Sequence, residues 1–293
     1  MRALLIGSRG QLGSDLCRVW TGDLVALPHQ ELDVCDRDQV YTTIDREAPD
    51  LVINTAAYHR VDECESNIAR AFEVNVLGAK YVAEAARQAG AAVMFISTDY
   101  VFDGEQGSSY DEEDPARPLS VYGVSKLTGE HVVQQSNPRH FVVRSSSLFG
   151  VAGASGKGGN FVETMLRKAR AEEPLRVVDD QLSSPTFTAD LAAKLQELAA
   201  TDRFGLYHVT NSGQASWYHF AEKIFELAGL RPSLTAITSE EHGAPAARPA
   251  CSVMANRALA EAGLSLLRPW EDALETYLSE KGYLASAAAS GTG

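Results

Sequence analysis

Short apolar runs alternate with longer amphipathic stretches along the first half of the chain. The runs are aliphatic and β-branched, as are strands buried on both faces of a parallel sheet. These predicted strands are residues 3–6, 24–27, 51–54, 93–97 and 141–144. The predicted helices between them are 12–20, 37–47, 69–90 and 122–135. The alternation predicts an α/β fold, a Rossmann-type doubly wound parallel sheet with right-handed crossovers and helices on both faces.

The regular alternation ends near Gly150. We therefore expect residues 1–150 to form the Rossmann domain, with further core elements within 175–210. Residues 151–284 are expected to form mainly a smaller C-terminal α/β lobe. The glycine-rich segment 153–159 predicts a mobile loop, and the small residues of 285–293 predict a disordered tail. The elements expected after Gly150 are helices 160–171, 189–199, 217–228 and 270–281 and a strand 175–178.

Composition narrows the class of protein. The 293 residues carry a net charge of −13, which disfavours binding to nucleic acids or anionic membranes. The chain opens on a short apolar strand rather than a signal peptide, and no apolar run approaches the ~20 residues that span a bilayer. The cysteines, Cys17, Cys35, Cys64 and Cys251, lack metal-binding spacing and are expected to be free thiols in a reducing cytoplasm.

A glycine-rich turn joins the first predicted strand to the first helix. Gly7, Gly10 and Gly13 have the spacing and context that let a backbone approach a pyrophosphate at a helix N-terminus. Gln11 and Leu12 lie within the same turn. A tight turn alone would also need such glycines, but the flanking strand and helix favour an NAD(P) site. We therefore assign the cofactor to residues 1–150.

The end of the second strand indicates which dinucleotide binds. A carboxylate there would bind the ribose 2′-hydroxyl and reject a 2′-phosphate, but this strand ends in Leu27-Pro28-His29. Arg9 and His29 could instead meet the phosphate, so we predict NADPH, with NADH also accepted. The further expected cofactor contacts are Asp33, Val34, Ala56, Ala57, Tyr58 and Asn75. Close packing against neighbouring elements would explain Ala56 and Ala57 equally well.

Tyr122 and Lys126 are spaced to share one face of a helix. A cation beside the phenol would lower its pKa from ~10 and make it a proton donor and acceptor for carbonyl chemistry. Thr98 ends the fourth strand, where open α/β sheets bind ligands, and could hydrogen-bond the reacting oxygen. A Tyr/Lys pair alone is common on exposed helices, but this order of motifs predicts a reductase.

Longer motifs carry a family resemblance. They are LDVCD at 32–36, VINTAAY at 52–58, STDYVFDG at 97–104, NFV at 160–162, VDDQ at 178–181, SPT at 184–186 and RPACSV at 248–253. With the glycine turn, they resemble the dTDP-4-dehydrorhamnose reductase family of extended short-chain dehydrogenases/reductases over residues 1–280. That family reduces the 4-keto group of dTDP-4-dehydro-L-rhamnose to dTDP-L-rhamnose for surface polysaccharide.

The resemblance implies roles for individual residues. Tyr122 would donate the proton, Lys126 would bind the nicotinamide ribose and tune the pKa of Tyr122, and Thr98 would orient the carbonyl. Among the implied substrate contacts, Asp99 could instead cap backbone, Phe161 could be core, and Arg248 could form a surface ion pair. The implied substrate contacts are Asp99, Val101, Phe102, Ser147, Asn160, Phe161 and Arg248.

The chain also departs from the family pattern. Ser147 stands where relatives commonly carry an aromatic residue, which puts the sugar in question more than the reaction. Asp15 and Asp190 fall near the positions of Mg²⁺-binding carboxylates in some relatives, but we interpret them as solvated helix acids and predict no metal.

Alternative functions remain at the sequence level. One is a related nucleotide-sugar 4-ketoreductase that makes another deoxysugar. Another is a non-catalytic protein like the regulatory subunit of methionine adenosyltransferase, which the intact Thr98, Tyr122 and Lys126 argue against. The expected partner is a small sugar nucleotide, and the expected oligomeric state is a monomer or homodimer.

Overall fold

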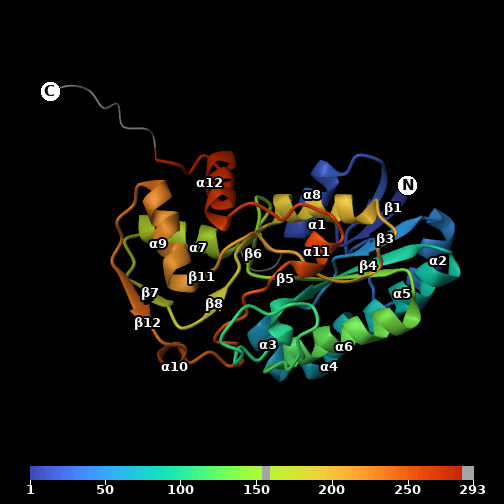
Figure 1. Ribbon diagram of the computed structural model, residues 1–293, viewed down its shortest axis with the longest axis horizontal. Coiled ribbons are helices and arrows are strands. Elements are labelled where there is room, and N and C mark those ends of the chain that lie inside the picture. Colours follow the sequence, from blue (N-terminus) through green and yellow to red (C-terminus); the bar gives the residue numbers. More distant parts are fainter. Residues whose placement is uncertain (154–158, 286–293) are drawn as a thin grey trace.

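The computed structural model describes residues 1–153 and 159–285. A main α/β body lies beside a smaller lobe that contains most of the later elements (Figure 1). Most of the predicted loop 153–159 and all of the predicted tail except Ala285 lie outside the described residues.

Parallel strands form the centre of the main body, six of them within the described residues. The strands are β1 (Arg2–Ile6), β2 (Asp23–Leu27), β3 (Leu51–Asn54), β4 (Ala92–Thr98), β5 (His140–Ser145) and β10 (Gly205–His208). Their order is β10-β5-β4-β3-β1-β2, so the chain reverses its direction across the sheet between β1 and β3. Open α/β sheets bind ligands at such a switch point, beyond the carboxyl ends of the strands.

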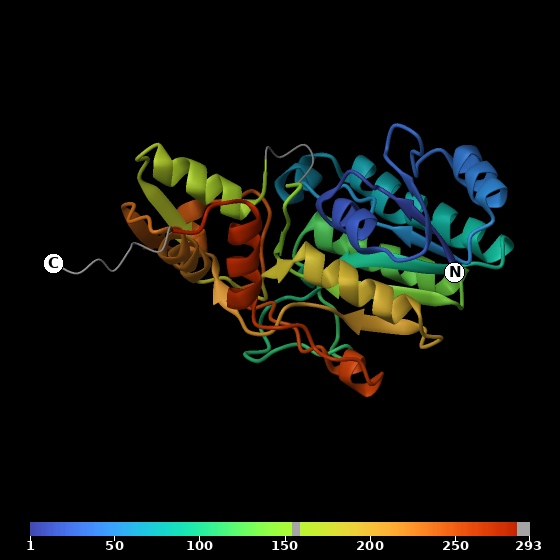
Figure 2. The same cartoon turned by 90° about the horizontal axis from the view of Figure 1, so that it is seen from above.

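Helices cover both faces of this sheet (Figures 1 and 2). One face carries α1 (Gln11–Val19), α8 (Thr188–Ala199) and α11 (Arg257–Glu261), which bury leucines such as Leu16 and Leu195. The other carries α2 (Arg37–Glu47), α5 (Ala79–Gln88) and α6 (Val121–Ser136), which bury Ile44, Val82 and Val133. The predicted doubly wound Rossmann-type fold is confirmed.

The single helix predicted over 69–90 is wrong. The segment consists of most of α4 (Ile68–Phe72), a π-helical stretch η1 (Glu73–Gly78) and then α5, and it is preceded by α3 (Val61–Ser66). Within η1, the fully buried Asn75 hydrogen-bonds the backbone of Tyr58 in both directions. Gly78 lets η1 approach the loop that follows β2, since a Cβ on Gly78 would lie 2.7 Å from Val34 Cγ2 in that loop. These tertiary contacts favour a π-helical insertion that helical spacing does not reveal.

The smaller lobe packs helices around short paired strands. Its helices are α7 (Phe161–Arg170), α9 (Trp217–Ala228), α10 (Ser239–His242) and α12 (Trp270–Glu280). Its strand pairs are β7 (Leu175–Val178) with β12 (Leu234–Ile237), β8 (Leu182–Ser183) with β11 (Ala215–Ser216), and β6 (Leu148–Phe149) with β9 (Thr186–Phe187). Stacked and edge-on aromatic rings fill its core, including Phe149, Phe187, Phe220 and Tyr277. The lobe therefore has an interior of its own beside the sheet.

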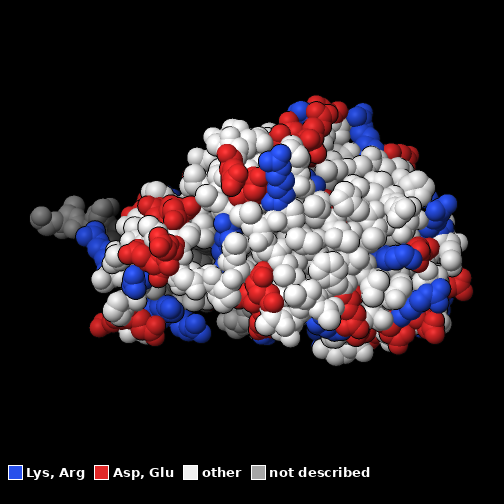
Figure 3. All heavy atoms as spheres, turned by 90° about the horizontal axis from the view of Figure 1, so that it is seen from below, with Lys and Arg blue, Asp and Glu red and all other residues white. Residues whose placement is uncertain are grey.

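A strap, residues 246–252, returns from the small lobe across the main body. Ala246 and Arg248 bind Asp62 on α3, and the strap backbone pairs with Leu182 through Ala250 and Ser252. No helix within the described ranges is long and apolar enough to cross a membrane. On the face shown in Figure 3, acidic and basic groups intermingle around a broad uncharged area.

Candidate active site

The glycine turn lies at the switch point between β1 and β3. Gly7 adopts φ +89°, and a Cβ on it would lie 2.6 Å from Thr55 Oγ1, just beyond β3. A Cβ on Gly13 would lie 2.2 Å from the Gly7 carbonyl oxygen, so only glycine lets α1 start so close to β1. Gly10 is the N-cap of α1, and no side chain caps that end. The amides of this end therefore face outward, as a pyrophosphate site requires.

The predicted 2′-phosphate ligands lie at one corner of the sheet. The Gly7 and Ser8 amides donate to the Leu27 carbonyl at 2.9 and 3.2 Å, which holds the glycine turn against the end of β2. Arg9 follows this turn and His29 follows β2, and both are exposed. The geometry thus places two adaptable basic groups where the two loops meet.

The other predicted cofactor contacts already bind other parts of the protein, so they shape the cofactor site rather than offer free polar groups to a ligand. Asp33 accepts a hydrogen bond from the Cys35 amide, and Val34 is buried against η1. Ala56 donates its amide to Asn54, at the end of β3. Asn75 is fully used by Tyr58 and by Ser125 on α6. Ala57 and Tyr58 are half-buried beside them.

Thr98 and Tyr122 meet at the carboxyl end of β4. The Thr98 hydroxyl, which donates to Asp99, lies near enough to the Tyr122 phenol to influence its pKa, and the Tyr100 ring lies edge-on to the Tyr122 ring at 5.7 Å. Gly123 permits this approach, since a Cβ there would lie 2.2 Å from the Tyr100 carbonyl oxygen. Burial raises the pKa of Tyr122, and the nearby Thr98 hydroxyl offsets this only in part. The phenol is therefore protonated at neutral pH.

The expectation that Lys126 sits beside Tyr122 and lowers its pKa is wrong for this structure. Lys126 Nζ donates to the Ile96 carbonyl at 2.6 Å and lies 4.0 Å from the centre of the Phe95 ring. Both partners belong to β4, so the side chain runs under the helix toward the sheet. Burial lowers the pKa of Lys126 to about 7, against an opposing effect of Glu130. Desolvation is the largest influence on the pKa of both side chains, and the spacing of residues along a helix does not reveal it.

Asp99 is the centre of a buried cluster of hydroxyls. It accepts hydrogen bonds from Thr98 at 3.1 Å, Ser146 at 2.8 Å and the strap residue Ser252 at 2.6 Å. Burial raises the pKa of Asp99, and these hydrogen bonds oppose that shift. The cluster ties β4, the loop after β5 and the strap together, so a strand-end carboxylate here fixes the shape of the site.

A narrow cavity lies between this cluster and the small lobe. It brings together the predicted residues Asp99, Ser147 and Arg248. Sequence reasoning missed the rest of its lining, which is Tyr100, Gln181, Leu182, Ser183, Trp217, Pro249 and Ser252. Ser147 adopts φ 45° and shares a hydrogen bond with Ser183 at 2.8 Å.

Arg248 closes one side of the cavity. Its guanidinium donates to both Asp62 carboxylate oxygens at 3.0 Å and to the Ala246 carbonyl at 2.9 Å. Burial alone would raise the pKa of Asp62, but the hydrogen bonds from Arg248 and Ala246 hold it below its usual range. Arg248 thus presents a cation at the cavity while it anchors the strap to α3.

Comparison with known proteins identifies the family. The model described as RmlD substrate binding domain matches residues 1–282. The chain belongs to this family. It is 40% identical over 283 residues to the spore coat polysaccharide biosynthesis protein SpsK of Bacillus subtilis (strain 168), which covers 96% of this chain and 98% of that protein. The resemblance found in the motifs is confirmed.

Two further relatives of this RmlD-family chain agree. dTDP-4-dehydrorhamnose reductase of Aggregatibacter actinomycetemcomitans is 39% identical over 269 residues, covering 86% of this chain and 90% of that protein. The crystal structure of dTDP-4-dehydrorhamnose reductase from Bacillus anthracis in complex with NADP has a TM-score of 0.91 and 37% identity. That alignment covers 95% of this chain and 99% of the other.

Several predicted site residues of this RmlD-family chain lie in the protein core instead. Leu12 packs beneath the sheet, while Val101 and Phe102 are fully buried in a separate apolar cluster, where Phe102 stacks on Tyr110. The 3₁₀ turn η2 (Asp99–Val101) directs these side chains away from the cavity. Any contact of theirs with a ligand is therefore through the backbone.

Asn160 and Phe161 also serve the fold. Asn160 caps α7 and donates to Gln11, Gly150 and Tyr277, which joins the lobe to α1. Phe161 packs on Trp217 at 4.7 Å between ring centres. It supports an aromatic wall of the cavity rather than forming one. Trp217 is the first residue of α9, directly after the N-cap Ser216, and this position was the available sequence signal that it could line the site.

The expectation of solvated acids at Asp15 and Asp190 is wrong. Asp15 is buried, where it accepts from Thr188 at 2.5 Å and pairs with Arg18. Asp190 pairs with Arg268 and Asn211. Each carboxylate has protein partners that explain it, and no group of metal-ligating side chains occurs among the described residues.

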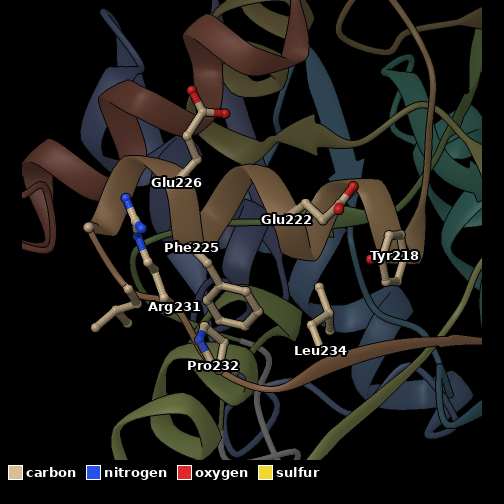
Figure 4. A pocket seen from close by; sticks show the side chains of 9 residues that line it. Tyr218, Glu222, Phe225, Glu226, Arg231, Pro232 and Leu234 are labelled. Atoms are coloured by element: carbon tan, nitrogen blue, oxygen red, sulfur yellow. The ribbon is translucent and has the colours of Figure 1, made fainter.

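A larger cavity of about 490 Å³ lies on the outer side of the small lobe. Figure 4 shows Tyr218, Glu222, Phe225 and Glu226 along α9, with the Phe225 ring toward Pro232 and Leu234. None of the candidate site residues lines it, whereas the candidate substrate contacts Asp99, Ser147 and Arg248 line the narrow cavity. We therefore assign the substrate site to the narrow cavity beside Asp99, on chemistry rather than on size.

Proposed function

We propose that this RmlD-family chain reduces the 4-keto group of dTDP-4-dehydro-L-rhamnose, with NADPH as reductant, to give dTDP-L-rhamnose. The observation that carries the proposal is the placement of Thr98 and Tyr122 together at the carboxyl end of β4, in the same parallel sheet whose β1 leads into the glycine turn. A relative named for this reaction and a structural neighbour in complex with NADP support it.

The residues of the glycine turn fit a bound dinucleotide. Gly7 and Gly13 leave space that a Cβ would fill, and the uncapped start of α1 offers amides to the pyrophosphate. Arg9 and His29 would hold the 2′-phosphate. NADH lacks this phosphate and would therefore bind more weakly. The nicotinamide, when bound, supplies a hydride to C4 of the sugar.

The side chains at β4 and α6 supply the proton. Thr98 would donate to the carbonyl oxygen and fix its orientation. Tyr122, kept protonated by the raised pKa of its buried phenol, would deliver its proton to the alkoxide as hydride arrives. Lys126 would turn from the Ile96 carbonyl to the nicotinamide ribose. Addition of one hydride and one proton converts the ketone to an alcohol.

The residues around the narrow cavity would contact the sugar nucleotide. Asp99 would orient the sugar through its hydroxyl cluster, and Trp217 would offer an aromatic face in a chain whose Ser147 lacks one. Arg248 would meet the diphosphate, a role suited to a planar guanidinium. The main body, 1–150 with elements of 175–210, would thus bind the cofactor, and 151–284 would supply much of the substrate site.

A second candidate is reduction of another dTDP-4-keto sugar. The observation in its favour is Ser147, because a hydroxyl at this wall changes the contacts available to the sugar. A regulatory, non-catalytic role is disfavoured by the Thr98–Tyr122 contact. We further propose that the protein is cytoplasmic and acts as a monomer or homodimer.

Initial rates of NADPH oxidation test the proposal. The purified chain should oxidise NADPH when enzymatically prepared dTDP-4-dehydro-L-rhamnose is added, and the product should co-elute with dTDP-L-rhamnose. Turnover only with a different 4-keto sugar would favour the second candidate. Absence of turnover with any dTDP-4-keto sugar, despite NADPH binding, would contradict both.

A further inference from the structure

Two serines from different parts of the fold meet at the narrow cavity. Ser147 lies between β5 and β6, and Ser183 ends β8 in the small lobe. Their hydroxyl oxygens lie 2.8 Å apart, and both residues line the cavity. Neither serine takes part in the proposed transfer of hydride or proton, so the pair needs another explanation.

The backbone of Ser147 has an unfavourable conformation. In the part of the chain that the structure describes, three residues other than glycine have a positive φ: Ala48, Ser147 and Glu172. Ala48 is the C-cap of α2 and Glu172 follows the end of α7, where left-handed backbone is common. Ser147, at φ 45°, ends no helix. Backbone strain of this kind concentrates at ligand sites and persists only where the surrounding structure holds it, and here it accompanies the contact with Ser183.

The two serines keep hydrogen-bonding capacity for a ligand. Each hydroxyl has one proton and two lone pairs. One proton forms the bond between the serines, and no acceptor among the described residues takes the other. Ser146, which precedes Ser147, gives its own proton to Asp99 at 2.8 Å. The Ser147–Ser183 pair can therefore both donate to a polar group in the cavity and accept from one.

The volume of the narrow cavity limits which group can enter it. It is about 10 Å³, close to the smallest space that holds one water molecule. A single hydroxyl group fits this space, whereas a sugar ring stays outside it. The buried Asp99 and Ser252, whose side chains are hydrogen-bonded at 2.6 Å, also line the cavity and make it polar. The cavity therefore suits one hydroxyl group of a larger ligand.

The place of the cavity beside Thr98 indicates which hydroxyl group it receives. In the proposed function Thr98 orients the C4 carbonyl, and it donates at 3.1 Å to Asp99 in the cavity wall. The neighbouring substituents of the sugar are a hydroxyl on C3 and a methyl group on C5. A methyl group in the cavity would desolvate the serine hydroxyls without pairing them, which costs free energy. The C3 hydroxyl avoids that cost.

We propose that the Ser147–Ser183 pair is a specificity site that binds the C3 hydroxyl of the 4-keto sugar. The proposal rests on the proposed function and names a substituent that the substrate must carry. A site built to hydrogen-bond a hydroxyl rejects an analogue that lacks it, because the site's own polar groups are then left unpaired. The chain therefore selects 4-keto sugars with a free hydroxyl next to the ketone over their 3-deoxy counterparts.

Calorimetric titrations with dTDP-L-rhamnose and its 3-deoxy analogue test the pair without any turnover. Ser147→Gly removes one hydroxyl and suits a positive φ, so its thermal midpoint should not fall. It should weaken binding of dTDP-L-rhamnose about fivefold, the scale of one uncharged hydrogen bond, and leave the 3-deoxy analogue unchanged. Ser183→Ala, on the extended backbone of β8, should act in the same way and carries the test if Ser147→Gly does not fold.

Ala48→Gly is the matched control, because Ala48 has a similar φ of 41° and lies outside the cavity. It should change neither affinity. The native protein should prefer dTDP-L-rhamnose to the 3-deoxy analogue by about tenfold, and Ser147→Gly/Ser183→Ala should bind the two about equally.

Three results would overturn the proposal. They are equal weakening of both ligands in the variants, which a merely structural role would cause, equal binding of both ligands by the native protein, and a preference that appears against a 2-deoxy analogue instead. A native protein that shows the expected preference but does not reduce dTDP-4-dehydro-L-rhamnose would count against the proposed function alone.

Discussion

The two halves of the candidate site are built by different means. The cofactor half consists mainly of backbone: Gly7 and Gly13 shape a turn that also contains the exposed Arg9. The substrate half consists of side chains that are already hydrogen-bonded, such as Asp99 and Arg248. Backbone geometry is local in the sequence, whereas the side-chain half depends on a strap from the far end of the chain. The first half should therefore tolerate changes in side chains, and the second should not.

The sharpest way to separate the halves is Tyr122→Phe. Loss of the phenolic proton donor should lower kcat by about 10³-fold, within the usual range for general acid catalysis. The glycine turn is untouched, so NADPH affinity, measured by quenching of protein fluorescence, should stay within about twofold. Turnover close to that of the native enzyme would remove Tyr122 from the assigned role.

Two alanine substitutions in the glycine turn separate the effect on stability from the effect on NADPH binding. A Cβ at Gly13 would lie 2.2 Å from the Gly7 carbonyl oxygen, so Gly13→Ala should lose NADPH affinity and about 1–3 kcal/mol of stability. At Gly10 the nearest atom would be 3.4 Å away, and the backbone already suits alanine. Gly10→Ala should therefore weaken NADPH binding about tenfold while the thermal midpoint stays unchanged. Equal loss of stability in both variants would contradict this account of the turn.

Arg248→Met probes the substrate half. The change removes the cation at the cavity and the anchor of the strap on Asp62, so KM for the sugar nucleotide should rise about tenfold, the scale of one charge-assisted contact. Arg268→Met is the matched control, because Arg268 binds Asp190 in a similar two-bond pair outside the cavity. A similar KM in both variants would argue against Arg248 as a diphosphate ligand.

The smallest predicted effect is a dependence of stability on pH. Because burial lowers the pKa of Lys126 to about 7, the folded protein holds fewer protons than the unfolded chain between about pH 7 and the ordinary lysine value of ~10.4. The free energy of unfolding should therefore rise with pH in this window, with a contribution from Lys126 of up to about 1.4 kcal/mol per unit. Lys126→Met should remove that contribution. Identical slopes in urea titrations of both proteins would contradict it.

What the sequence predicted follows the same division. β3, α2, β7 and α9 lie where the pattern placed them. The strap could not be foreseen, because its contacts with Asp62 and Asp99 join residues more than 150 positions apart. Nor could the turning of Lys126 toward Ile96, which depends on burial between α6 and β4. The spacing of residues along the chain predicts local backbone geometry, but it predicts neither desolvation nor contacts between distant parts of the chain.

The central claim is that this chain moves hydride from NADPH to C4 of a dTDP-4-keto sugar. The most direct test uses NADPH that carries deuterium at both positions of nicotinamide C4, with dTDP-4-dehydro-L-rhamnose as substrate. NMR of the product should show dTDP-L-rhamnose with one deuterium at sugar C4 and none elsewhere. A product without deuterium at C4, or NADPH oxidation without reduction of the sugar, would contradict the claim.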